Sequence, residues 1–148
     1  MEYASIRECL APCGLSCEKC MGYANGKIRE RAEKLSELLG DFDRYAERFS
    51  AFLPGFKNYP AFREILEHFR GADCAGCRKG SCKYPNCGVS ACFRRKGLDF
   101  CFQCDEFPCD KTNFDSDLKD RWVRMNMRMR EIGVQKYYEE TKDLPRYL

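Results

Sequence analysis

Histidine is scarce in this sequence and long apolar runs are missing, and both shortages limit what the chain can do. His68 is the single histidine among 148 residues, so catalytic dyads that use histidine as the base have one candidate at most. No stretch approaches the roughly 20 apolar residues of a membrane span. The first residues carry no basic segment followed by an apolar one, as a signal peptide would. We therefore expect a cytoplasmic protein without a membrane segment.

Cysteine, in contrast, is abundant. The chain has 12 cysteines, and six of them form the C-x-x-C pairs Cys17/Cys20, Cys74/Cys77 and Cys101/Cys104. This spacing lets two thiolates of one tight turn face the same ion, and two such turns complete a tetrahedron. In the cytosol thiols stay reduced, so the pattern indicates metal binding, with a disulfide scaffold as the alternative.

The pattern of apolar residues predicts one mainly α domain over residues 1–148 with an irregular, loop-rich, metal-binding module. Helical spacing over 28–39, 41–53 and 60–70 predicts three amphipathic helices, each with an apolar stripe that must be buried. Asp115 or Ser116 is expected to cap a long helix that Gly133 ends, and a short helix should follow. The expected segments are an N-terminal cysteine cluster (9–20), a helical segment (22–71), a cysteine-rich zinc module (72–111) and C-terminal helices (113–148).

The second cysteine block holds eight thiols, enough for two tetrahedral all-cysteine zinc sites. Gly76, between Cys74 and Cys77, suits a zinc knuckle because glycine accepts a positive φ there and lets backbone N–H groups point at a sulfur. One grouping joins Cys74 and Cys77 to the pair Cys101/Cys104 and leaves Cys82, Cys87, Cys92 and Cys109 for a second ion. Interleaved groupings are equally compatible with the spacing.

The first block allows several kinds of chemistry. Cys13, Cys17 and Cys20 have the C-x3-C-x2-C spacing of radical-SAM enzymes, but a chain of this length lacks the large barrel that such enzymes need. A further zinc site, closed by Cys9 or by a thiol of the second block, is the simpler interpretation. The alternatives are an iron–sulfur redox or iron-sensing protein, and an enzyme whose metal keeps one position open for substrate.

Two other groups of side chains could take part in function. His68 could be a ligand, but with thiols in surplus we expect a half-exposed helix residue. A basic set could bind phosphate or a nucleic-acid backbone; it consists of Arg94, Arg95, Arg121, Arg124 and Arg128. The alternative is a solvated helix face, because Asp117 and Asp120 precede Arg121 and Arg124 by four residues, the favourable order for ion pairs.

Several segments together resemble the domain-of-unknown-function 3795 family. They are the stretch from Cys13 to Tyr23, Cys74 to Cys77, Cys87 to Gly97, Cys101 to Cys109, and the tail around Arg121, Trp122 and Ile132 to Val134. The family consists of small bacterial and archaeal proteins that are thought to bind zinc and have no assigned activity. The resemblance implies the metal ligands Cys13, Cys17, Cys20, Cys74, Cys77, Cys87, Cys92, Cys101, Cys104 and Cys109. Cys82 is intermediate and Cys9 falls outside the family pattern.

The sequence as a whole predicts a cytoplasmic protein with two or three structural zinc ions and no catalysis of its own. Each four-thiolate zinc site adds two net negative charges, so two sites lower the formal charge from +3 to −1 and weaken any general affinity for nucleic acid. We expect an adaptor that presents residues 78–100 to a protein partner, with weak nucleic-acid binding as the alternative.

Overall fold

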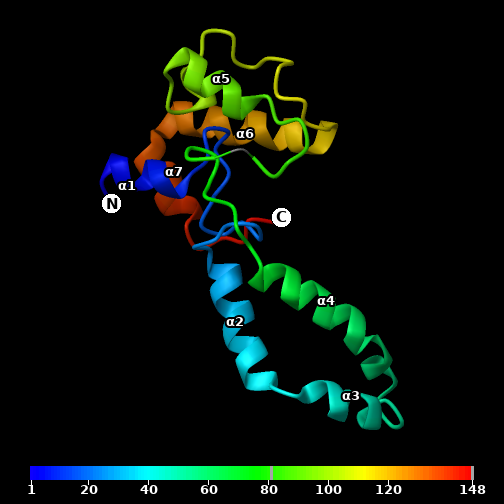
Figure 1. Cartoon of the computed structure of the whole chain (residues 1–148). Helices are drawn as coiled ribbons and strands as arrows, with labels where there is room; N and C mark the ends of the chain where they lie inside the picture. The colour runs from blue at the N-terminus through cyan, green and yellow to red at the C-terminus, as the bar shows by residue number, and fades with distance from the viewer. Residues whose placement is uncertain (81, 148) are drawn as a thin grey trace.

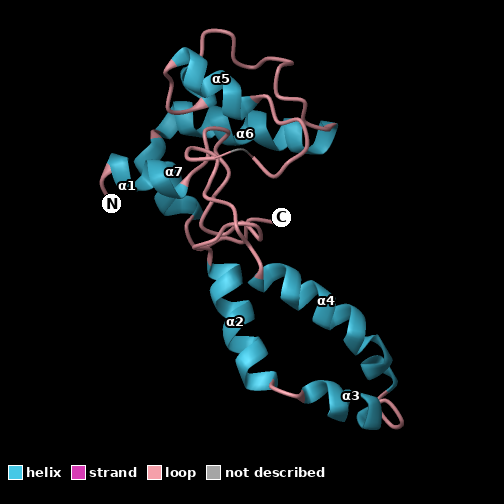
Figure 2. Cartoon of the chain, viewed as in Figure 1, coloured by secondary structure: helices cyan, strands magenta, loops and turns pink. Residues whose placement is uncertain are grey.

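The computed structural model describes residues 1–80 and 82–147, and it is mainly helical, as predicted. These residues form seven α-helices and two short 3-10 helices, with two isolated β-bridges and no strand (Figure 2). The α-helices are α1 (Tyr3–Cys9), α2 (Lys27–Leu39), α3 (Phe42–Phe49), α4 (Tyr59–Arg70), α5 (Val89–Lys96), α6 (Ser116–Ile132) and α7 (Val134–Thr141). The 3-10 helices are η1 (Pro54–Asn58) and η2 (Cys101–Gln103).

The chain has two parts (Figure 1). Helices α2, α3 and α4 form an arm in which α2 and α4 contact each other and α3 lies at the far end. The other helices gather with the cysteine-containing loops at the opposite end. We call this second part the head; it comprises residues 1–26, 71–80 and 82–147. All the cysteines belong to the head.

The ends of the predicted helices agree with the structure where a cap or a glycine sets them. Gly40 ends α2 at φ 50°, and Gly133 ends α6 at φ 83°, both in the region that glycine tolerates best. The carboxylate of Asp115 accepts a hydrogen bond from the backbone N–H of Leu118 at 3.0 Å and so caps α6. Helix α3 is shorter than predicted, because a turn and η1 follow Phe49.

Helices α1 and α5 were not expected. Each spans fewer than nine residues and buries a single side chain deeply, Ile6 in α1 and Val89 in α5. Two turns give too few positions for an apolar period to stand out from a loop. The segment predicted as loop-rich therefore contains a helix whose last residue is followed by Gly97 in the left-handed conformation.

The head has two adjoining apolar clusters. The first joins α1, α6 and α7 through Ile6, Phe100, Met129 and Tyr137. The second surrounds the buried indole of Trp122 and includes Ala11, Cys13, Cys17, Val89 and Phe107. Five further cysteines pack against this second cluster, so these metal-binding candidates lie on an apolar support; they are Cys77, Cys87, Cys101, Cys104 and Cys109.

The arm leaves much of its apolar surface in contact with solvent. Leu38 is 87% exposed, and Phe52 and Ile65 are also exposed. The prediction that each amphipathic stripe is buried is therefore wrong for the arm, because α2 and α4 pack mainly on each other and leave Phe52 and Ile65 exposed. In the described part of the chain, no helix combines the length and the apolarity that crossing a bilayer requires.

Candidate metal centres

All twelve cysteines are free, and the predicted ligands line two separate pockets. The seven-thiol pocket is lined by Cys13, Cys17, Cys20, Cys74, Cys77, Cys82 and Cys87. The four-thiol pocket is lined by Cys92, Cys101, Cys104 and Cys109. Cys9 lines neither pocket; its thiol lies beside Tyr138 and Glu18, and burial raises its pKa.

The two cysteine blocks meet in the seven-thiol pocket because short backbone links hold their loops together. The first loop is closed by the hydrogen bond from the N–H of Cys17 to the carbonyl of Cys9 at 2.7 Å. The segment that follows pairs with the second block: the N–H of Ala24 donates to the carbonyl of Cys74, and the N–H of Cys74 donates to that of Gly22. These links set Cys17 against Cys77, although about 60 residues separate them in sequence.

Four thiols of this pocket are neighbours in space: those of Cys17, Cys77, Cys82 and Cys87. A hydrogen bond from the thiol of Cys77 lowers the pKa of Cys17 to about 6. The neighbouring thiols of Cys77 and Cys87 lower the pKa of Cys82 strongly. The bonds to Cys17 and Cys82 raise the pKa of Cys77, and the bond to Cys82 raises that of Cys87. Thiols of the two cysteine blocks are therefore neighbours in this pocket and influence one another's pKa values.

Backbone amides point at the sulfurs of the same pocket. The N–H of Gly76 donates to the sulfur of Cys74 and the N–H of Tyr84 to that of Cys82, both at 3.4 Å. Gly76 has φ 92°, as the zinc-knuckle prediction required. The neighbouring thiol of Cys82 is the main cause that raises the pKa of Cys87. The backbone amides of Val89 and Ser90 act in the opposite direction and lower it. Amides aimed at sulfur favour the thiolate, which is the form that binds metal.

The four-thiol pocket is small and lies against Trp122. Its cavity is about 30 Å³, enough for one water-sized particle. Burial raises the pKa of Cys101 to about 12, and the indole N–H of Trp122 opposes that rise. This N–H is fully buried and makes no hydrogen bond among the described residues, and the thiol of Cys101 lies near it. The ammonium of Lys96 donates to the sulfur of Cys104 at 3.0 Å.

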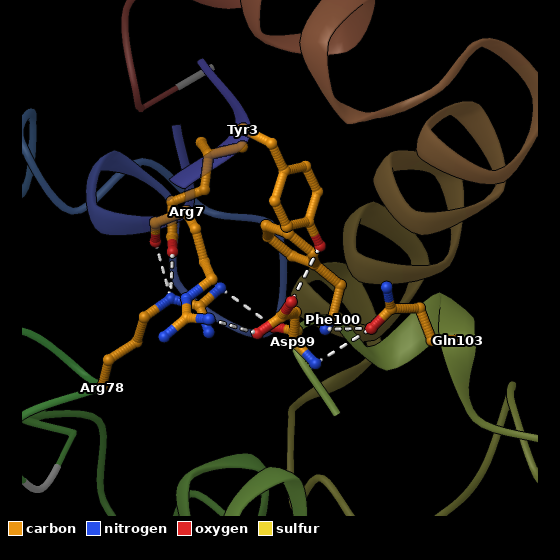
Figure 3. Close-up of polar contacts among 7 residues, drawn as sticks. Tyr3, Arg7, Arg78, Asp99, Phe100 and Gln103 are labelled. Atoms are coloured by element: carbon orange, nitrogen blue, oxygen red, sulfur yellow. Dashed lines mark hydrogen bonds and ion pairs between the residues drawn. The ribbon is translucent and has the colours of Figure 1, made fainter. Parts of the chain in front are cut away.

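Arg78, the residue after Cys77, ties the pocket to the N-terminus and to η2 (Figure 3). Its Nε donates to the carbonyls of Arg7 at 2.6 Å and Leu10 at 3.1 Å, and its Nη2 donates to that of Asp99 at 2.9 Å. The guanidinium also lies 4.9 Å from the centre of the Phe100 ring. Asp99 in turn pairs with Arg7 and accepts from the hydroxyl of Tyr3. This network fixes the position of Cys77.

Asn126 makes a second internal link, from the middle of α6. Its side-chain N–H groups donate to the carbonyls of Cys13 and Trp122, each at 2.9 Å, and its oxygen accepts from the N–H of Phe102 at 3.1 Å. The side chain is completely buried, so every one of these bonds replaces contact with water. Asn126 thereby holds the seven-thiol pocket and the four-thiol pocket on one helix.

The structure therefore distributes the predicted site residues differently from what the sequence analysis expected. The pairs Cys74/Cys77 and Cys101/Cys104, grouped on one ion in the sequence analysis, line different pockets. His68 is exposed on α4, beside Phe69. The sequence analysis did not identify Arg78 and Asn126 as residues that hold the pockets, because neither belongs to a motif. For Asn126 one signal was present: an asparagine on the core side of an amphipathic helix.

The donors in both pockets suit a soft metal. Thiolates are the ligands that zinc and iron–sulfur clusters take, and the amides and the Trp122 N–H aimed at sulfur are the partners that bound thiolates need. The residues therefore fit a thiolate-bound metal. In this structure no three Cys, His, Asp or Glu side chains within residues 1–80 and 82–147 converge closely enough to hold an ion.

The basic set divides between two places. Arg121, Arg124 and Arg128 line a cleft beside the seven-thiol pocket, formed by α6, α7 and the loop that follows Leu10. Arg94 and Arg95 lie on α5, and Arg94 donates to the carbonyls of Cys77 and Gly80. The ion pairs expected from Asp117 to Arg121 and from Asp120 to Arg124 are not formed among the residues that the structure describes.

Comparison with known proteins gave one match. The family model for a protein of unknown function, DUF3795, matches residues 9–114, which include every cysteine of the chain. The match ends before α6, so the resemblance of the tail lies outside it. Neither the search of curated proteins nor that of solved structures gave a match.

Proposed function

The chain belongs to the DUF3795 family, a family of unknown function, and we propose that it is a zinc-binding adaptor whose all-cysteine sites hold the head together. The main observation that supports this proposal is the four-thiol pocket. Four of the 14 residues that line a cavity of about 30 Å³ are cysteines, and this volume suits a single ion better than a four-iron cluster. The buried N–H of Trp122 beside Cys101 would become the hydrogen-bond donor to a bound thiolate.

Each pocket would hold one zinc ion. Cys92, Cys101, Cys104 and Cys109 would bind the first, and the contiguous thiols Cys17, Cys77, Cys82 and Cys87 the second. Structural zinc contributes roughly 10–16 kcal/mol of apparent binding free energy, ample to order the loops of the head. A zinc ion closed by four thiolates has no open position for substrate, which favours binding over catalysis. The thiol of Cys77 beside Cys17 argues against an open-sided metal on Cys13, Cys17 and Cys20.

Metal content of single serine variants tests this proposal. We expect two zinc ions per chain in the protein purified under reducing, anaerobic conditions. Cys101→Ser should lose the ion of the four-thiol pocket, and Cys77→Ser that of the seven-thiol pocket, each leaving one zinc. Cys9→Ser is the matched control and should keep both. Native mass spectrometry counts the ions, and full zinc occupancy in both Cys101→Ser and Cys77→Ser would contradict the ligand assignment.

The arm is the part best suited to contact a protein partner. Its apolar cleft of about 650 Å³ is lined by residues that include Leu35, Leu39, Phe42 and Phe62. Apolar surface of this kind, left open to solvent, marks interaction sites. The segment 78–100, first expected to meet the partner, is less suited because it ends in the core at Phe100.

A charge placed in this cleft tests the role of the arm. Phe62→Glu should abolish partners recovered by affinity purification from cells, because a carboxylate cannot be buried against an apolar surface without a large cost. Glu64→Gln, a change of charge on the same helix outside the cleft, should retain them. An identical set of partners for both variants would show that the arm cleft is not the binding surface.

A further inference from the structure

The cleft that holds three arginines of α6 adjoins the seven-thiol pocket and shares Leu15, Arg121 and Arg146 with it. It measures about 440 Å³, within the range of small-molecule sites. Five cationic side chains line it, and no aspartate or glutamate of the described residues does. The cationic lining residues are Lys19, Arg121, Arg124, Arg128 and Arg146.

Most of this positive charge has no counter-ion among the described residues. Arg128 pairs with Glu131 and Glu140. Arg121 donates instead to the carbonyl of Arg146, and Arg146 donates to the carbonyl of Ser16. Backbone carbonyls fix the two guanidinium groups in place without neutralising them, so their charge remains available to a ligand.

Lys19 and Ser16 complete the polar wall of the cleft. The ammonium of Lys19 donates to the carbonyls of Thr141, Lys142 and Leu144, at 2.8, 3.1 and 2.6 Å, and is likewise held by backbone alone. The hydroxyl of Ser16 has no hydrogen-bond partner within the described part of the chain. Such a hydroxyl is an available donor at the edge of a positive site.

The rest of the cleft is apolar. Leu10, Leu15, Met125, Tyr137 and Leu144 supply this part of the lining. A bare inorganic anion would leave this surface uncovered, whereas a ligand with an anionic head and an apolar body would contact both parts. Guanidinium groups present a planar fork of donors that matches the oxygens of phosphate.

We propose that this cleft binds a small organic phosphate, with the phosphoryl group at Arg121, Arg124 and Arg146 and an apolar or aromatic body against Met125 and Tyr137. Arg121 and Arg146 also line the seven-thiol pocket, whereas Arg124 lines this cleft alone. A nucleic-acid track is less favoured, because Arg94 and Arg95 do not line the cleft and a single cavity offers one place for a phosphate.

Calorimetric titration of the full, metal-containing chain with phenyl phosphate tests the proposal. We expect saturable binding at one site, at least about tenfold tighter than inorganic phosphate, since each tenfold step is about 1.4 kcal/mol. Arg124 is exposed and forms no ion pair with a described residue, so Arg124→Glu should fold normally. It should weaken binding by at least about tenfold. Arg31→Glu, the same charge reversal on the exposed side of α2, is the control and should bind as the unaltered chain does.

Three outcomes would overturn the proposal. They are no saturable binding of phenyl phosphate, equal affinity in the chain with Arg124→Glu, and equal affinity for inorganic and phenyl phosphate. A single-stranded oligonucleotide that binds tighter than phenyl phosphate, with a steep dependence on salt that reports several phosphate contacts, would also overturn it in favour of nucleic acid.

Discussion

At the scale of single residues, buried polar side chains decide how the two thiol pockets are held. Asn126 and Arg78 each join three segments that lie far apart in sequence. A fully buried amide that satisfies two carbonyls and one N–H contributes little net free energy, yet its removal leaves each partner unsatisfied. Such residues matter for stability more than their number of bonds alone suggests.

Asn126→Leu should lower the free energy of unfolding by about 3 kcal/mol, because the carbonyl of Cys13 and the N–H of Phe102 would lose their partner in a dry environment. Urea denaturation of the metal-containing protein measures this. Asn25→Leu, at an exposed position outside the helices, should change stability by no more than about 0.5 kcal/mol. Equal losses for both variants would show that the network around Asn126 has no special role.

At the scale of elements, α5 depends on a close approach between two backbones. Gly88 precedes α5, and its N–H donates to the carbonyl of Thr112 at 3.1 Å. A Cβ atom at Gly88 would overlap the carbonyl oxygen of Lys111. The start of α5, which carries Cys92 and follows Cys87, therefore fits against the segment after Cys109 only with glycine at this position.

Gly88→Ala should accordingly destabilise the head by about 3 kcal/mol, since the two backbones must separate. The thermal unfolding midpoint of the metal-containing protein reports the change. Gly55→Ala is the control, because a Cβ atom there meets nothing within 4 Å. A midpoint that is the same for Gly88→Ala and for the unaltered chain would contradict the close packing of α5.

The same elements show how far the sequence alone can predict this fold. Helices α2, α4, α6 and α7 could be predicted from apolar spacing, from the cap Asp115 and from glycines such as Gly40 and Gly133. Helices α1 and α5 could not, because two turns carry too little periodic signal. The cysteines could be recognised as ligand candidates, but their division into pockets depends on contacts such as Cys17 with Cys77, which only the folded chain defines.

At the scale of the whole molecule, the head and the arm have different sources of order. The head packs α1, α5, α6 and α7 around loops that hold all the cysteines, and the arm leaves apolar side chains in solvent (Figure 1). We infer that metal orders the head and that partner binding covers the arm. On this proposal, thiolate-bound zinc is part of the folded protein.

The most direct test is the metal content of the anaerobically purified protein, with an absorbance spectrum of the same sample. The account predicts two zinc ions per chain and no visible band, because zinc has no electronic transitions in the visible range. Iron with acid-labile sulfide and a broad visible absorbance would contradict it, as would a folded protein that contains no metal.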